Sequence, residues 1–131
     1  MAGVIVLDAS VLIAFLEGDD EHHEAAEALL AQEIDDDFGA SPLTLAEVLV
    51  VPARDDRLEE ARLTLRVIEV EELPFPEDTA VRLALLRSET GLKMPDCCVL
   101  LAAEHVGGRL ASFDVGLRKA AVKRSLQTVP A

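Results

Sequence analysis

The stretch Val4-Ile5-Val6-Leu7-Asp8-Ala9-Ser10 sets the fold, because four apolar residues run directly into a carboxylate. A short continuous apolar run of this kind is typical of a strand buried on both faces, as in a parallel sheet covered by helices. Asp8 then lies where the strand leaves the sheet, and in open α/β sheets ligands bind outside the carboxyl ends of the strands. The position also suits an aspartate that only caps the following helix, with Ser10 sharing that task. The stretch predicts a buried first strand and leaves both roles of Asp8 open.

Strand and helix patterns alternate along the rest of the 131-residue chain. Further strands are predicted at 38–41, 70–73, 109–113 and 125–129, and helices at 11–17, 19–32, 42–51, 55–67, 77–89, 95–106 and 115–122. Strands that alternate with helices imply parallel pairing, with the connecting helices on both faces of the sheet. A chain of this length forms a single core. We therefore predict one α/β domain over residues 1–131, a three-layer α/β/α sandwich with a mostly parallel central sheet.

Charge is distributed unevenly along the chain. The formal net charge is -13, from 25 acidic and 12 basic residues, and residues 1–53 contain no lysine or arginine. A chain this acidic is a poor electrostatic match for nucleic acid, since phosphate binding rests on clustered cations. The segment 118–124 is the exception, because it holds four of the basic residues. The sequence therefore predicts an acidic face and a locally basic one.

The two cysteines, Cys97 and Cys98, are adjacent in the sequence. Neighbours in a helix point in different directions, and two cysteines are too few for a disulfide framework or a zinc site. The apolar N-terminal stretch lacks the basic start and the cleavage site of a signal peptide, and no run reaches the roughly 18 apolar residues of a membrane span. We expect reduced core cysteines in a soluble, cytoplasmic protein that binds no membrane.

Four of the 25 acidic residues do not fit a solvent-exposed helix face. Asp8 and Asp114 each follow a predicted strand. Glu47 is the only charged residue in the segment 38–53, where the helix is apolar nearly all round and is expected to be largely buried. Asp96 opens a helix with apolar residues on its own face, which predicts a carboxylate that points inward.

Ordinary roles stay open for the two acids on helices. Glu47 suits a capping box with Thr44, in which the glutamate reaches back to the first backbone N–H of the helix. Ser41-Pro42 is a better start for that helix and would leave Glu47 without a capping role. Asp96 suits a first-turn aspartate that the helix dipole favours.

If the four carboxylates converge on one crevice, each close pair repels by roughly 3 kcal/mol at an effective dielectric near 20. Several such pairs rival the whole stability of a domain, about 5–15 kcal/mol. Either some of the carboxylates stay protonated or a cation lies among them. Ligation by oxygen alone, without histidine or cysteine, is the kind that Mg²⁺ or Mn²⁺ prefers.

Four short motifs carry a family resemblance. In chain order they are Asp8-Ala9-Ser10, Thr44-Leu45-Ala46-Glu47-Val48-Leu49, Met94-Pro95-Asp96 and Ser112-Phe113-Asp114. Their order and spacing resemble those of PIN-domain nucleases, and most closely those of the VapC toxins of bacterial toxin–antitoxin pairs. The resemblance covers essentially the whole chain. This sequence departs from the pattern at residues 115–116, where many relatives carry a further acid or asparagine that concerns the second metal ion.

The resemblance implies a metal-dependent endoribonuclease that acts as a toxin and cleaves structured RNA through a metal-activated water. By this likeness Asp8, Glu47, Asp96 and Asp114 form an acidic quartet that binds Mg²⁺ or Mn²⁺, and Ser10 assists at the site. It further implies a small antitoxin protein as partner and a homodimer.

Other functions are weighed against this one. A phosphotransfer receiver would need a lysine at the end of the last strand, where Pro130 stands, and an aspartyl phosphatase would need an aspartate in place of Ser10. A catalytically inert PIN-like binding module remains as the alternative. The pair His22 and His23 is expected to lie on a solvated helix start and not to bind metal.

Binding surfaces can also be predicted. The segment 118–124 and Lys93 are expected to follow the RNA backbone, because a chain with no tryptophan or tyrosine and with four phenylalanines offers little for stacking on bases. The apolar faces of the segments 17–32 and 55–68 suit either a groove for an antitoxin helix or plain core.

Overall fold

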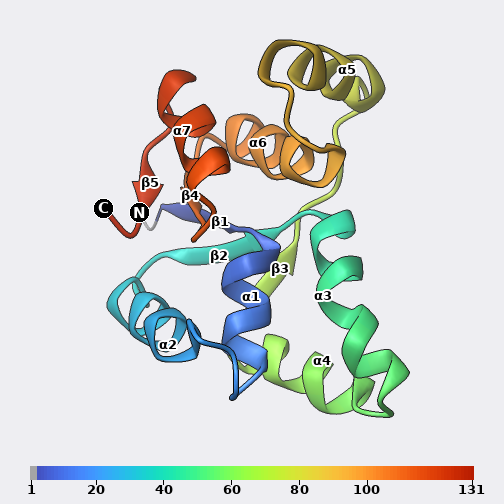
Figure 1. Cartoon of the computed structure of the whole chain (residues 1–131), viewed down its shortest axis with the longest axis vertical. Coiled ribbons are helices and arrows are strands. Elements are labelled where there is room, and N and C mark those ends of the chain that lie inside the picture. Colours follow the sequence, from blue (N-terminus) through green and yellow to red (C-terminus); the bar gives the residue numbers. More distant parts are fainter. Residues whose placement is uncertain (1–2) are drawn as a thin grey trace.

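The structure, a computed structural model, describes residues 3–131. Within these residues, parallel strands alternate with helices, as Figure 1 shows. In chain order the elements are β1 (Val4–Leu7), α1 (Ala9–Leu16), α2 (His23–Gln32), β2 (Asp37–Ala40), α3 (Pro42–Arg54), α4 (Leu58–Val67), β3 (Val70–Glu72), α5 (Thr79–Thr90), α6 (Met94–Val106), β4 (Arg109–Ala111), α7 (Val115–Lys123) and β5 (Thr128–Val129).

The sheet has the strand order β3-β2-β1-β4-β5, and every pairing in it is parallel. β1 is the central strand, with Val6 opposite Gly39 of β2 on one side and Leu110 of β4 on the other. The carboxyl ends of β1 and β4 are therefore neighbours, although more than a hundred residues separate Asp8 from Ser112 along the chain. The predicted α/β fold with a parallel sheet is confirmed.

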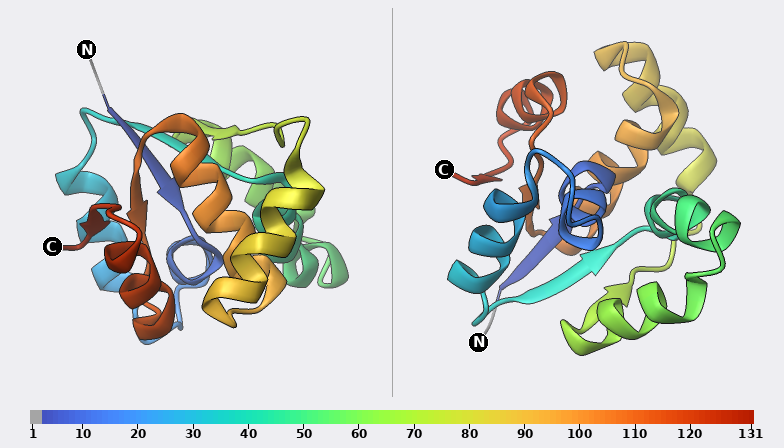
Figure 2. Two further views of the ribbon diagram at one scale, coloured as in Figure 1. Left: turned by 90° about the horizontal axis from the view of Figure 1, so that it is seen from above. Right: turned by 60° about the horizontal axis from the view of Figure 1, so that its bottom comes forward.

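Helices cover both faces of the sheet, with α1 to α4 on one side and α5 to α7 on the other (Figure 1). Ile5 and Leu7 of β1 point into the first layer, whereas Val6 points into the second, as the alternation of side chains along a strand requires. All three are fully buried, which is why the strand is apolar without a break. Figure 2 shows α5 and α6 packed side by side over the second face.

Several predicted boundaries are wrong. The helix predicted at 11–17 with a Ser10 cap begins at Ala9, because Asp8 takes the cap position. The helix predicted at 19–32 begins at His23, since backbone turns take up residues 18–22. The strand predicted at 109–113 ends at Ala111.

The helix predicted to stop before Pro52 continues through it to Arg54. A proline in a helix removes one backbone hydrogen bond and crowds the preceding turn. Here Pro52 lies in the last turn and is buried, so packing offsets part of that cost.

Cys97 and Cys98 are buried in α6 and form no disulfide, as predicted. Burial raises the pKa of the Cys98 thiol to about 11, with smaller contributions from Cys97 and Glu47. The Cys98 thiol is therefore protonated at neutral pH and a poor nucleophile. Within residues 3–131, no helix combines the length and the apolar character that a bilayer crossing requires.

Candidate functional site

Asp8 lies directly after β1, and three hydrogen bonds hold its carboxylate. Oδ1 accepts from the backbone N–H of Val11 at 3.0 Å and from the Ser10 hydroxyl at 2.7 Å, and Oδ2 accepts from the Ser112 hydroxyl. The residue is only 4% exposed. Asp8 thus caps α1 and also presents a fixed carboxylate at the carboxyl end of the central strand, so both roles that the sequence left open are structurally compatible.

Burial raises the pKa of Asp8 above its ordinary value. The hydrogen bonds from Ser112, Ser10 and Val11 act in the opposite direction, because they favour the charged form, while the negative charge of Asp114 adds to the rise. A buried carboxylate with a second acid close by favours a bound cation.

Two serine hydroxyls join the start of α1 to the start of α7. The Ser10 Oγ donates to Asp8 and accepts from the Phe113 backbone N–H at 3.1 Å. The Ser112 Oγ donates to Asp8 and accepts from the Asp114 backbone N–H at 2.9 Å. Each hydroxyl therefore fixes the spacing between the ends of β1 and β4.

Ser112 is a candidate site residue that the sequence reasoning missed. Its side chain is fully buried, and both of its hydrogen-bonding functions are used at the acidic site. The available signal was its hydroxyl, the only polar side chain of residues 110–113 and two residues before Asp114. Polar side chains buried at the end of a strand need partners, which in this case are the two neighbouring aspartates.

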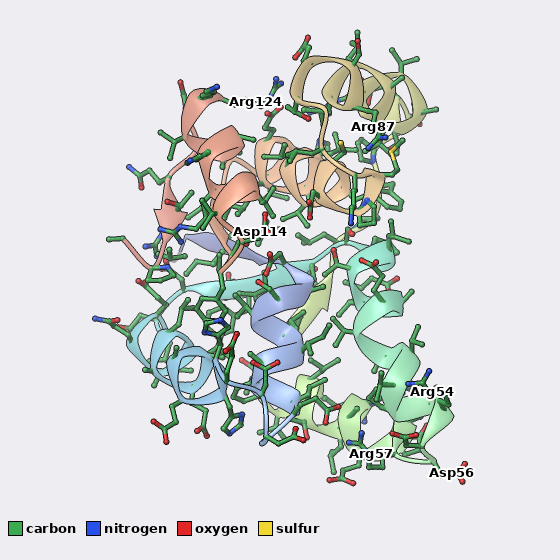
Figure 3. All side chains as sticks on the ribbon, in the orientation of Figure 1. Arg54, Asp56, Arg57, Arg87, Asp114 and Arg124 are labelled. Atoms are coloured by element: carbon green, nitrogen blue, oxygen red, sulfur yellow. The ribbon has the colours of Figure 1, made fainter. Side chains whose placement is uncertain are left out.

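Asp114 caps α7 through a hydrogen bond from the Leu117 backbone N–H to Oδ2 at 2.8 Å. Figure 3 labels it beside the first turn of that helix. It is exposed and follows β4 after two intervening residues, and not directly as predicted, because the strand ends at Ala111. It remains beside Asp8, because the Ser112 hydroxyl donates to Asp8 and accepts from the Asp114 backbone N–H.

Asp96 lies in the first turn of α6 and is half-buried. Burial raises its pKa, and the negative charges of Asp114, Asp8 and Glu47 raise it further, in that order of size. These three charges therefore reach Asp96, while the hydrogen bonds of Ser112 place Asp8 and Asp114 side by side. Lys93, the residue before α6, acts on Asp96 in the opposite direction.

The prediction that Glu47 lies on a largely buried helix is wrong. Glu47 is exposed, and most of α3 is not buried. α3 buries only Thr44, Val48 and Pro52, one stripe along the helix, while Val50 is 55% exposed. The apolar residues all round the helix are therefore a surface feature and not a sign of burial. The capping-box role is also wrong, since Ser41 accepts the hydrogen bond from the Thr44 backbone N–H at 3.1 Å.

The donor set fits Mg²⁺ or Mn²⁺, since it consists of carboxylate and hydroxyl oxygens. In the part of the chain that the structure describes, however, no three His, Cys, Asp or Glu side chains already converge tightly enough to hold an ion. Hydrogen bonds fix Asp8 and Asp114, whereas among residues 3–131 no hydrogen bond holds the carboxylate of Glu47 or Asp96. Those two side chains are free to complete a coordination shell.

The two histidines make protein contacts. The ring of His22 stacks on Phe113, with 5.1 Å between centroids, and Nδ1 of His23 hydrogen-bonds with the Ala14 carbonyl at 2.7 Å. These contacts fix the turn before α2 against α1 and against the segment that precedes α7.

The fold and this edge define an open parallel α/β protein with acidic side chains beyond the carboxyl ends of β1 and β4. The family model of the PIN domain matches residues 5–123. The chain therefore belongs to the PIN domain family, and the family resemblance indicated by the four motifs is confirmed.

Solved structures of similar fold include proteins of toxin–antitoxin systems. A chain in a toxin–antitoxin complex from Klebsiella pneumoniae is 26% identical, with a TM-score of 0.70 and 89% of each chain covered. FitAcB from Neisseria gonorrhoeae is 24% identical, with a TM-score of 0.69 and 95% of each chain covered. The Mycobacterium tuberculosis toxin VapC20, which cleaves the sarcin–ricin loop, is 19% identical, with a TM-score of 0.72, covering 88% of this chain and 94% of that one. Among curated proteins, no sequence matches this chain significantly.

Proposed function

We propose that this chain is an endoribonuclease toxin of a toxin–antitoxin pair, dependent on Mg²⁺ or Mn²⁺ and acting in the cytoplasm. The observation that carries the proposal is the buried carboxylate of Asp8 at the end of β1, which the Ser112 hydroxyl links to Asp114. Four acids from distant parts of the chain would repel one another at one edge of a sheet, and this cost is removed when a cation binds among them. The likeness to toxin–antitoxin proteins supports the same conclusion.

The residues of the site divide the work between them. Asp8 and Asp114 are the positioned ligands, and the Ser10 and Ser112 hydroxyls hold Asp8 in its orientation. Asp96 of α6 and Glu47 of α3 would supply the remaining carboxylate ligands of the ion. When bound, the cation supplies a water of lowered pKa for attack on phosphorus and neutralises charge on the phosphoryl and leaving oxygens.

The test is cleavage of total RNA by the purified protein with MgCl₂ or MnCl₂, with the cut ends mapped by sequencing. We expect discrete cuts in structured RNA that disappear with a chelator and fall by about a thousandfold in Asp8→Asn, because a lost metal ligand removes several kcal/mol of transition-state stabilisation. Asp56→Asn is the matched control. Asp56 is exposed at φ 57°, a conformation that asparagine adopts readily, so it makes the same change in charge without strain.

Full cleavage in the chelator, or in Asp8→Asn, would refute the proposal. A protein that neither cuts RNA nor binds Mn²⁺ by calorimetry would instead be the inert PIN-like binding module. Calorimetry on Asp96→Asn completes the distinction, since a metal site loses affinity in that variant and an inert module shows no difference.

We also propose a small antitoxin as partner. The net charge of -13 suits a basic protein, and apolar side chains of α3 and α4 are exposed, with Val67 at 73%. Between α3, α4 and β3 lies a hollow of about 250 Å³ whose wall has apolar parts, Leu45, Leu49 and Leu65, beside the charged Arg62, Arg66 and Glu72, a lining that suits an amphipathic helix. Co-expression with the protein encoded beside it should yield a complex that Leu49→Glu weakens.

A homodimer is proposed as well, through the exposed apolar face of α5. Val81 and Leu85 lie one turn apart on it, 65% and 55% exposed. Light scattering should give twice the chain mass, and Val81→Glu with Leu85→Glu should give the mass of one chain. A monomeric natural protein would contradict this.

A further inference from the structure

A cleft lies between α7 and the segment that joins α5 to α6. Its volume is about 490 Å³, and Leu92 and Ala120 form apolar parts of its wall. Lys119 and Lys123 stand one turn apart on the α7 side. The cleft therefore combines an apolar wall with two cations on one helix face.

One end of this cleft reaches the acidic site. Gly116 lines it, and a side chain added at Gly116 would meet Oδ2 of Asp114 at 3.4 Å. On the opposite wall, Leu92 is followed by Lys93, whose charge lowers the pKa of Asp96. A strand bound at the carboxylates can therefore continue into the cleft without crossing another element.

The two arginines of the segment 118–124 are already engaged by the protein. Arg124 pairs with Glu104 and with Glu89, at 2.8 Å for the second, and so ties α7 to α6 and α5 at the far end of the cleft (Figure 3). Arg118 donates to the backbone carbonyls of Ser112, at 3.0 Å, and of Pro130. Of the segment 118–124, which was predicted to follow the RNA backbone, only the lysines therefore have free charges for that contact.

Lys119 and Lys123 have their charges available. In the part of the chain described, no carboxylate lies within salt-bridge distance of either. The other flank of the site is negatively charged, because α2 and the turn before it carry acids and residues 1–53 contain no lysine or arginine. A phosphate backbone is therefore attracted toward Lys119 and Lys123 and repelled from the side of α2.

We propose that the RNA strand leaves the carboxylate site through this cleft, with Lys119 and Lys123 contacting neighbouring phosphates on the same side of the cut. The inference rests on the proposed RNA cleavage and adds the path of the substrate. The wall of Leu92 and Ala120 offers no hydrogen bond from its side chains, so this part of the strand is bound without regard to base sequence.

The test compares Lys119→Gln with Lys123→Gln, made together, against the control pair Arg54→Gln with Arg66→Gln. Both pairs remove two positive charges. The control arginines are exposed on α3 and α4 and form no salt bridge within residues 3–131, and Arg54 lies far from Arg124 in Figure 3. The probe is a short fluorescein-labelled RNA oligonucleotide, and binding is measured in the presence of a chelator because the proposed cleavage requires the cation. The dissociation constant is measured at several salt concentrations.

We expect the lysine pair to weaken binding about tenfold and to lower the slope of log Kd against log salt by about 0.7 for each phosphate that a lysine no longer neutralises. The control pair Arg54→Gln with Arg66→Gln should change both the dissociation constant and the salt slope by less than the lysine pair does. Cleavable substrates trimmed on the side of the cut that the lysines contact should bind the natural protein less tightly, whereas their affinity for the lysine variant should not change. Trimming on the other side should lower the affinity for both proteins equally.

An equal effect of the two pairs on Kd and slope would overturn the proposal, because it would reflect net charge alone. Equal loss on trimming either side would also overturn it. If the oligonucleotide binds as expected while no RNA is ever cut, the path stands and the proposed cleavage fails, so the two outcomes are distinguishable.

Discussion

The two halves of the acidic site differ in how firmly they are held. Asp8 is 4% exposed and accepts three hydrogen bonds, whereas Glu47 is exposed on α3 and its carboxylate accepts none from residues 3–131. The firm half comes from the ends of adjacent parallel strands, and the free half comes from helices that pack against them. The strands thus preset one side of a cation site, and the helices leave the other side adjustable.

Such a division has an energetic reason. Four fixed carboxylates would keep their full mutual repulsion in the absence of a cation, but two mobile ones can turn toward water. These two side chains then lose conformational entropy only when an ion binds, at a cost of about 1–2 kcal/mol for a long side chain. The difference between the halves predicts three further measurements.

The largest effect should come from the cation itself. With Mn²⁺ at about a hundred times its dissociation constant, the free energy of unfolding should rise by about 2.7 kcal/mol. Asp8→Asn should abolish this gain, while Glu47→Gln should keep part of it, because the mobile ligand contributes less after its ordering cost. Thermal unfolding with and without MnCl₂ measures both, and Asp56→Asn serves as the unchanged control. Equal losses in the two variants would remove the distinction between the halves.

The hydroxyls that hold the firm half should contribute unequally. Ser112→Ala leaves Oδ2 of Asp8 and the backbone N–H of Asp114 without a buried partner, which should cost roughly 2 kcal/mol. Ser10→Ala breaks the corresponding pair of bonds, but Ser10 is only partly buried and water can replace its hydroxyl, so roughly 1 kcal/mol is expected. Urea unfolding of both variants in metal-free buffer gives the comparison. A larger loss in Ser10→Ala would contradict it.

The smallest effect concerns pH and the free half. Because the pKa of Asp96 is raised in the folded chain, the folded state holds its proton more tightly than the unfolded state does, and stability falls as pH rises from about 3.8 through the raised value. Asp96→Asn removes that loss. The variant should be more stable than the natural protein at neutral pH without metal, by no more than about 1 kcal/mol since water screens the half-exposed group.

The advantage of Asp96→Asn should vanish near the ordinary pKa of an aspartate, where the natural residue is also neutral. Melting temperatures across pH, in the presence of a chelator, provide the measurement. A difference that grows as the pH is lowered would show that the sign is wrong.

Sequence patterns predicted the sheet well for a physical reason. A strand buried on both faces must be apolar without interruption, so Val4–Leu7 could be recognised directly, and the polar residue that ends the run had to be Asp8. The convergence of Asp8 and Asp114 followed from parallel pairing, because the carboxyl ends of neighbouring strands meet at one edge.

The environment of Glu47 could not be predicted in the same way. Periodicity reports which residues of a helix are apolar, but not how much of the helix its neighbours cover. α3 packs along a single stripe, so Val50 and Val51 are exposed although the pattern favoured burial. Ser112 was missed because a single hydroxyl beside a strand has no periodicity at all, and its value appears only when Asp8 is folded against it.

The position of β1 at the centre of the sheet has a consequence during synthesis of the protein. The strand is made first, yet its neighbour β4 begins only at Arg109. A nascent chain on the ribosome can carry Asp8, Glu47 and even Asp96 while still lacking Ser112 and the strand that aligns them. The acidic edge therefore assembles only after residues 109–114 have been translated, and contacts between such distant segments form slowly. Between translation of β1 and translation of β4, the growing chain therefore lacks a complete acidic edge.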